Sequence, residues 1–147
     1  MKAFVDTTVL LASVMADQPH HGQSRELVLS LRRGQDACAA HSLAELYSTL
    51  TRMPPPYRRN ADEAMLVLAD IQARVTPVSL TPEEYIAAIS EYSSRGVVGG
   101  VIYDALIAQC ARKARAEKIY TWNIRHFRQF GPEIEKRLRV PGAASTP

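Results

Sequence analysis

The sequence predicts an α/β fold in which one parallel β-sheet is covered by helices on both faces. Short apolar segments alternate with longer segments of helical periodicity along the whole chain. This order favours a parallel sheet, because consecutive parallel strands are joined by crossover helices. A length of 147 residues and the lack of an internal repeat indicate a single domain.

The N-terminal part begins with a short buried strand. That strand is predicted over residues 2–5, and Thr7 or Thr8 can cap the helix that continues through Met15. A second helix is predicted over residues 21–33, where apolar residues recur at helical spacing.

Prolines divide the middle of the chain. A small-residue strand over 36–40 leads into a helix over 42–52, which ends before three consecutive prolines. The next helix begins at Asn60. Pro77 lies within the strand predicted over 75–80 and favours an edge position, because proline has no amide hydrogen for a neighbouring strand.

A strong helix start follows that strand. Thr81 is a suitable cap, Pro82 suits the first helical turn, and Glu84 stands three residues after the cap. Gly96 closes this helix. The most apolar helix is then predicted over 101–116.

The C-terminal part is predicted to contain one strand and one short helix. The strand covers 118–122, and the helix covers 123–130 and ends at Gly131 and Pro132. The residues that follow Pro141 have the composition of a disordered tail.

Composition excludes a membrane-spanning or disulfide-rich protein. Apolar residues make up 46% and charged residues 22%, as in ordinary soluble globular domains. No apolar run reaches the ~18 residues of a membrane span, and no secretory signal opens the chain, so a cytoplasmic location is expected. Cys38 and Cys110 lie in apolar stretches and are expected to be buried, reduced thiols.

Positive charge is concentrated near the C-terminus. Residues 112–147 contain nine Lys or Arg and three Asp or Glu, whereas residues 1–111 contain nine and twelve. Such a one-sided field favours a polyanionic partner, although a solvated helix face would produce the same pattern. Arg125, His126 and Arg128 are candidates for phosphate contacts.

Polar residues from distant parts of the chain are expected to meet at one edge of the sheet. Asp6 ends the first strand, Glu45 lies early in the helix after the second strand, and Asn123 follows the strand over 118–122. Open α/β sheets bind ligands at the carboxyl ends of their strands. Asp104, near the start of the most apolar helix, can point to the same edge.

Each of these residues also has a structural interpretation. Asp6 and Asn123 can cap helices, and Asp104 can favour a helix start through the helix dipole. Glu45 fits a capping box with Ser42. Their joint placement favours a metal site, because clustered carboxylates repel one another unless a cation or protons compensate. Oxygen ligands without neighbouring His or Cys indicate Mg²⁺ or Mn²⁺.

Four segments of the chain resemble the PIN-domain family, and within it the VapC-type toxins of type II toxin–antitoxin pairs. They are FVDTTVLLA (4–12), SLAELYSTLTR (42–52), YDALIAQCA (103–111) and IYTWNIRHF (119–127). All four occur in the family's order and at its spacing. The resemblance covers residues 1–141 and implies a single PIN-like nuclease domain, which leaves 142–147 as the disordered tail.

The resemblance also implies site roles. Asp6 and Asp104 would be the principal metal ligands, and Glu45 would complete the acidic catalytic centre. Asn123 stands where many members carry a fourth Asp, so a second metal ion would be held more weakly.

Two threonines match supporting positions of the family. Thr7 and Thr121 match positions that hold the site through hydroxyl hydrogen bonds. Thr8, which stands where Asn is frequent, is assigned no catalytic role.

The function implied is endonucleolytic hydrolysis of RNA phosphodiester bonds with Mg²⁺ or Mn²⁺. The protein would be a toxin that forms a homodimer and pairs with a cognate antitoxin. Two alternatives stay open: a non-catalytic PIN-like module that binds RNA or protein, and a phosphatase for small molecules. Tyr47, Tyr85 and Tyr103 alternate with apolar neighbours and are expected in the core rather than in a base-stacking platform.

Overall fold

A five-stranded parallel sheet forms the centre of the molecule. The computed structural model describes residues 1–143, and its strands are arranged in the order β3-β2-β1-β4-β5. The strands are β1 (Ala3–Val5), β2 (Ala37–Ala39), β3 (Thr76–Val78), β4 (Lys118–Tyr120) and β5 (Leu138–Arg139).

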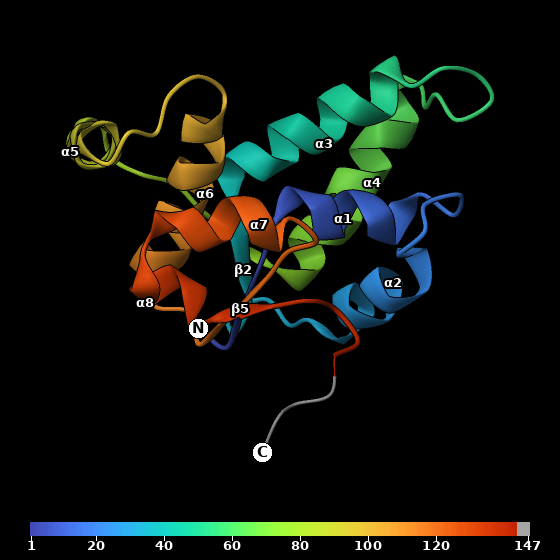
Figure 1. The fold of residues 1–147 in the computed structure, drawn as a ribbon. Coiled ribbons are helices and arrows are strands. Elements are labelled where there is room, and N and C mark those ends of the chain that lie inside the picture. Colours follow the sequence, from blue (N-terminus) through green and yellow to red (C-terminus); the bar gives the residue numbers. More distant parts are fainter. Residues whose placement is uncertain (144–147) are drawn as a thin grey trace.

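Helices connect these strands and surround the sheet (Figure 1). The α-helices are α1 (Thr7–Val14), α2 (His21–Ser30), α3 (Ala40–Arg52), α4 (Ala61–Arg74), α5 (Pro82–Ser94), α6 (Val101–Lys113), α7 (Ile124–Phe127) and α8 (Pro132–Glu135). A 3-10 turn, η1 (Arg128–Phe130), separates α7 from α8.

The sheet has an apolar core on each face. Phe4 packs in a cluster with residues of α5, α6, α7 and α8, whereas its neighbours Ala3 and Val5 pack in a cluster with residues of α1 to α4. Successive side chains of a strand point to opposite faces, so three buried residues of β1 serve both cores. The predicted α/β fold, with a parallel sheet covered on both faces, is therefore confirmed.

The strand predicted around Pro77 lies at the edge of the sheet. β3 pairs only with β2 among the described strands, so the missing amide hydrogen of Pro77 faces no further strand. The helix starts at Thr81 and Asn60 are also confirmed. Each side chain accepts a hydrogen bond from the backbone amide three residues later, and a Glu at that position completes a capping box.

The C-terminal segment differs from the prediction in two ways. The helix predicted over 123–130 is divided into α7 and η1. The helix α8 and the strand β5 were not predicted, because four and two residues are too short to show a period. Gly131, with φ of 110°, leads directly into α8.

The remaining sequence expectations concern burial and the chain end. Cys38 and Cys110 are free and buried as predicted, and burial raises their thiol pKa values to about 12 and about 11. Pro141 is buried at the start of a turn, and residues 144–147 of the predicted tail lie outside the described part of the chain. No helix within residues 1–143 is long and apolar enough to cross a bilayer.

Candidate active site at the carboxyl edge of the sheet

Asp6 is the buried acid at the centre of the carboxyl edge. It follows β1 directly and is only 2% exposed. Its Oδ2 accepts hydrogen bonds from Thr121 Oγ1 at 2.8 Å and from Thr8 Oγ1 at 2.9 Å. Thr121 follows β4, the strand beside β1, so the parallel register brings the two side chains together.

Burial sets the electrostatics of Asp6. Desolvation raises the pKa of its carboxyl from 3.8 to about 6, and the charge of Asp104 acts in the same direction. The hydroxyls of Thr121 and Thr8 lower the pKa, but by less than burial raises it. The carboxylate form is therefore costly here unless a cation compensates its charge. The site thus has the charge and the oxygen donors that suit Mg²⁺ or Mn²⁺.

Asp104 approaches the same edge from the first turn of α6. Its Oδ2 lies 3.3 Å from His126 Nδ1, and that nitrogen lies 2.9 Å from Asn123 Nδ2. Both contacts use the same nitrogen, which donates to Asp104 in one tautomer of His126 and accepts from Asn123 in the other. Asn123 and Asp6 stand at helix N-cap positions, but neither side chain makes a capping hydrogen bond. The capping interpretation of these two residues is therefore wrong.

Glu45 reaches the edge from α3. Its Oε1 lies 3.1 Å from the hydroxyl of Thr7, the residue that follows Asp6, and that hydroxyl also lies 2.8 Å from Ser42 Oγ. The alternative of a capping box with Ser42 is wrong, because α3 already begins at Ala40 and Ser42 lies inside it. Thr7 connects Glu45 to the chain segment that carries Asp6.

The acids do not converge on a single point. Within residues 1–143, no group of three or more His, Cys, Asp or Glu side chains is compact enough to hold one metal ion. Two imidazoles also approach these acids: His126 Nδ1 lies 3.3 Å from Asp104 Oδ2, and His41 Nε2 lies 3.9 Å from Glu45 Oε1. The assignment of Asp6, Asp104 and Glu45 as a shared metal site stays a prediction.

Thr8 is the residue that sequence reasoning missed. Besides donating to Asp6, its hydroxyl accepts a hydrogen bond from the Trp122 amide at 3.1 Å and so joins the segments after β1 and β4. The available signal was a hydroxyl two residues after a strand-end Asp, a spacing that suits a local side-chain contact.

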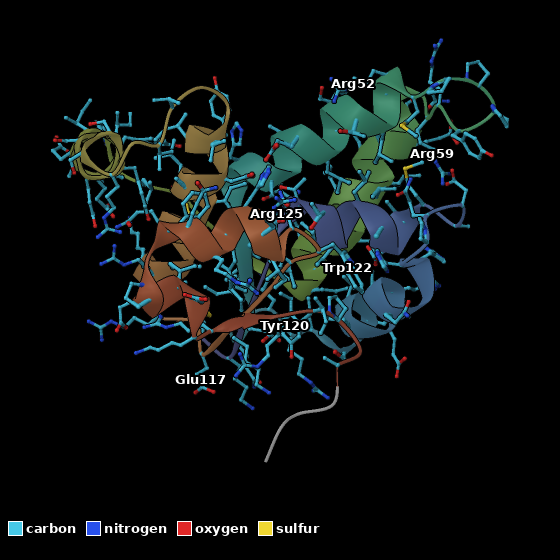
Figure 2. All side chains as sticks on the ribbon, viewed as in Figure 1. Arg52, Arg59, Glu117, Tyr120, Trp122 and Arg125 are labelled. Carbon is cyan, nitrogen blue, oxygen red and sulfur yellow. The ribbon has the colours of Figure 1, made fainter. Side chains whose placement is uncertain are left out.

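The basic residues of the C-terminal third are divided between the two edges of the sheet. Arg125 lies near the acidic edge on α7, whereas Glu117 lies at the far end of the molecule (Figure 2). A cleft of about 660 Å³ opens around Glu117, on the amino side of β4 and β5. The cations that line it are Arg112, Arg115, Lys136 and Arg137. Much of the predicted positive field is thus remote from the acids.

The three predicted RNA contacts lie on the short helical segment after β4. Arg125, His126 and Arg128 are all exposed on α7 and η1. Arg128 forms an ion pair with Glu135 at 3.4 Å, and Arg125 has no carboxylate within ion-pair distance among residues 1–143. Arg125 is therefore the cation of this group that is best placed to meet an added anion.

Two of the three tyrosines assigned to the core are exposed. Tyr103 is 57% exposed and Tyr85 is 37% exposed, so the core assignment is wrong for both. Tyr47 does pack against the core formed with α1 to α4, as predicted. Tyr103 precedes Asp104 on α6, whose buried face is formed by Ala105, Ala108 and their neighbours.

Comparison with known proteins identifies relatives along almost the whole chain. The model of the PIN domain family matches residues 3–131. Ribonuclease VapC40 of Mycobacterium tuberculosis is 34% identical over 135 residues, which cover 92% of both chains. Ribonuclease VapC27 of the same organism is 32% identical over 114 residues, 77% of this chain and 79% of the relative.

Solved structures share the fold at lower sequence identity. VapC20 of Mycobacterium tuberculosis, described as a sarcin–ricin loop cleaving toxin, superimposes with a TM-score of 0.66 at 20% identity, over 85% of this chain and 92% of the other. VapBC2 from Rickettsia felis, solved with a promoter DNA fragment, gives 0.65 at 19% identity, over 95% and 98%. The fold and the sequence matches agree, and this chain belongs to the PIN domain family.

Proposed function

We propose that this protein is an endoribonuclease of the VapC type that hydrolyses RNA phosphodiester bonds at the carboxyl edge of its sheet. The observation that carries the proposal is the buried Asp6 carboxylate, held by two threonine hydroxyls beside the charge of Asp104. The names of its relatives, ribonucleases aligned over most of the chain, support the same activity.

Asp6, Asp104 and Glu45 are the residues that would hold Mg²⁺ or Mn²⁺. When bound, the ion would polarise the scissile phosphate, activate water and stabilise the leaving oxygen. Thr8 and Thr121 would fix the rotamer of Asp6, and Thr7 would orient Glu45. Fixed acids need no reorganisation when negative charge builds up on the phosphate.

His126, donating from Nδ1, would orient Asp104 from its other side. Arg125 has no carboxylate partner in residues 1–143, so it is free to neutralise a phosphate of the bound RNA. A phosphate contact of Arg125 would position the RNA backbone without selecting a base sequence.

RNA cleavage with and without EDTA tests the proposal. Asp104→Asn is expected to lower kcat at least a hundredfold while leaving the folded structure intact, because it removes a charge and keeps the size of the side chain. Asp62→Asn is the matched control, since Asp62 lies in the first turn of α4 as Asp104 does in α6. Full activity of Asp104→Asn, or cleavage that persists in EDTA, would contradict the metal site.

The two alternatives predict other outcomes of the same assay. RNA binding without cleavage would indicate a non-catalytic module. Hydrolysis of a small phosphoester such as p-nitrophenyl phosphate, without RNA cleavage, would indicate a phosphatase.

We also propose that the protein is the toxin of a toxin–antitoxin pair, forms a homodimer and acts in the cytoplasm. Apolar side chains exposed on α4 and α5, among them Leu66 at 72% and Ile86 at 70%, are available for contacts between proteins. Expression of the chain alone is expected to arrest growth of a bacterial host, and expression of Asp6→Asn is not. Harmless expression of active enzyme would indicate a processing nuclease instead.

A further inference from the structure

An apolar pocket opens beside the acidic edge. It has a volume of about 230 Å³ and lies between the start of α3, the segment after β3, and α5 and α6. Its apolar walls are formed by Ala39, Val78, Leu106 and Ile107. This volume is below the roughly 300 Å³ typical of pockets for drug-sized ligands, and it suits a single flat ring system.

Two aromatic rings stand at this pocket. His41 and Tyr103 lie nearly parallel, with an interplanar angle of 17° and ring centroids 6.1 Å apart. Both are well exposed: Tyr103 to 57%, and the side chain of His41 to 48%. Burial of an apolar ring in the core does not explain Tyr103, because the core side of α6 is formed by other residues.

The two helices that carry the rings also carry two of the acids. Tyr103 is adjacent to Asp104 on α6, and His41 lies one helical turn before Glu45 on α3. A nucleotide whose phosphate meets these acids therefore has its base within reach of the rings. Phosphate and base of one nucleotide would be bound by neighbouring residues of the same two helices.

We propose that the gap between the His41 and Tyr103 rings binds one nucleobase of the RNA, that of a nucleotide next to the cleaved bond. This proposal rests on the ribonuclease function proposed above. Two stacking steps of about 3.4 Å each slightly exceed the present separation of the rings. A small rotation of the exposed Tyr103 side chain accommodates the difference. Stacking on aromatic rings is the usual way in which proteins bind unpaired bases of RNA.

An RNA with one mapped cleavage site provides the test. Each nucleotide near that site is replaced in turn by an abasic one, and kcat and KM are measured with Mn²⁺. For the native protein, one abasic position next to the cleaved bond is expected to raise KM by about 10- to 100-fold. For Tyr103→Leu, KM for intact RNA is expected to be raised by the same factor, and the abasic nucleotide is expected to raise it little further.

Two further variants sharpen the result. Tyr103→Phe keeps the ring and is expected to respond to the abasic nucleotide as the native protein does. Tyr57→Leu removes a tyrosine of similar exposure, 45%, far along the chain in the loop after α3, and is expected to match the native protein. Melting temperatures confirm that each variant is folded.

The outcomes separate this proposal from the one on which it rests. A native protein that cleaves no RNA overturns both. A native protein that cleaves RNA, with the same abasic penalty in Tyr103→Leu, overturns the base pocket alone. The third outcome is that Tyr103→Leu has an unchanged KM for RNA but binds a co-expressed protein partner more weakly. That result would assign the pocket to the partner and also overturn the proposal.

Discussion

Asp6 combines full burial with a negative charge, and its surroundings stabilise it only in part. Two hydroxyls reach its Oδ2, yet burial and Asp104 leave its pKa at about 6. A group of this kind lowers the stability of the metal-free fold at neutral pH. Such a loss of stability is typical of functional sites, where side chains are arranged for the reaction and not for the stability of the fold.

The metal-free protein is expected to lose stability between about pH 4 and pH 6 because of Asp6. Its folded-state pKa of about 6 exceeds the ordinary value of 3.8. The protonated form therefore favours folding below about pH 4, and this contribution is lost as the pH rises through the folded-state pKa. The shift corresponds to a free energy on the order of 3 kcal/mol.

Urea unfolding in EDTA measures this effect. Asp6→Asn removes the titrating group and keeps the other acids as a common background. The variant is expected to be more stable than the native protein at about pH 7 and to lose that advantage at about pH 4. Parallel stability curves for the two proteins would contradict the buried, titrating Asp6.

Asn123 is expected to weaken metal binding because an amide lacks the charge of a carboxylate. Asn123→Asp should raise Mn²⁺ affinity by about tenfold, roughly 1.4 kcal/mol, because it adds charge within reach of the His126–Asp104 pair. Calorimetric titration with Mn²⁺ measures the change. Asn60→Asp, an exposed amide at the start of α4, is the matched control. Equal affinities of native and Asn123→Asp protein would remove Asn123 from the metal site.

Helix starts are the elements that local sequence predicts best. Thr81 and Asn60 form capping boxes as their patterns indicate, because both partners lie within three residues of each other. Ser42 and Glu45 have the same pattern, but the helix begins two residues earlier and leaves both side chains for the site. A cap pattern is therefore reliable only where the helix start itself is fixed by flanking residues.

Thr81→Ala is expected to destabilise the protein by about 1 kcal/mol, since α5 loses its side-chain cap. Ser48→Ala on the exposed face of α3 is expected to stay within about 0.5 kcal/mol of the native protein. Thermal or urea unfolding measures both. An equal and negligible loss of unfolding free energy in the two variants would show that the cap of α5 does not contribute to stability.

The two edges of the sheet carry different charged groups. Acids and Arg125 lie at the carboxyl edge, and a cleft with four cations lies at the amino edge. RNA bound at the acids would lie on the carboxyl edge, away from this cleft. The net charge of the chain alone does not decide which of the two edges binds RNA.

Arg125→Ala is expected to raise KM for RNA several-fold and to reduce the salt dependence of KM by about one phosphate contact. Lys136→Ala, on the opposite edge, is expected to leave both quantities near their native values. Cleavage rates over a range of salt concentrations measure the two slopes. A larger effect of Lys136→Ala would move the RNA to the amino edge.

Much of the fold follows from local chemistry. The sequence predicted the buried strand before Asp6, the strand over 118–122, which the structure has as Lys118–Tyr120, the edge position of Pro77 and the apolar helix that carries Asp104. Each of these depends on neighbours in the sequence. The segments around Asp6, Glu45 and Asp104 also predicted that these acids would lie at one edge of a parallel sheet. The family resemblance drew on the same local segments.

Only the tertiary structure decided which side chains touch. The Thr8 hydroxyl contacts the Trp122 amide, 114 residues away, and His126 contacts Asp104, 22 residues away. The exposure of Tyr103 beside His41 depends in the same way on how α3 and α6 pack. Periodicity and capping patterns act over a few residues, whereas these contacts depend on strand register and helix packing.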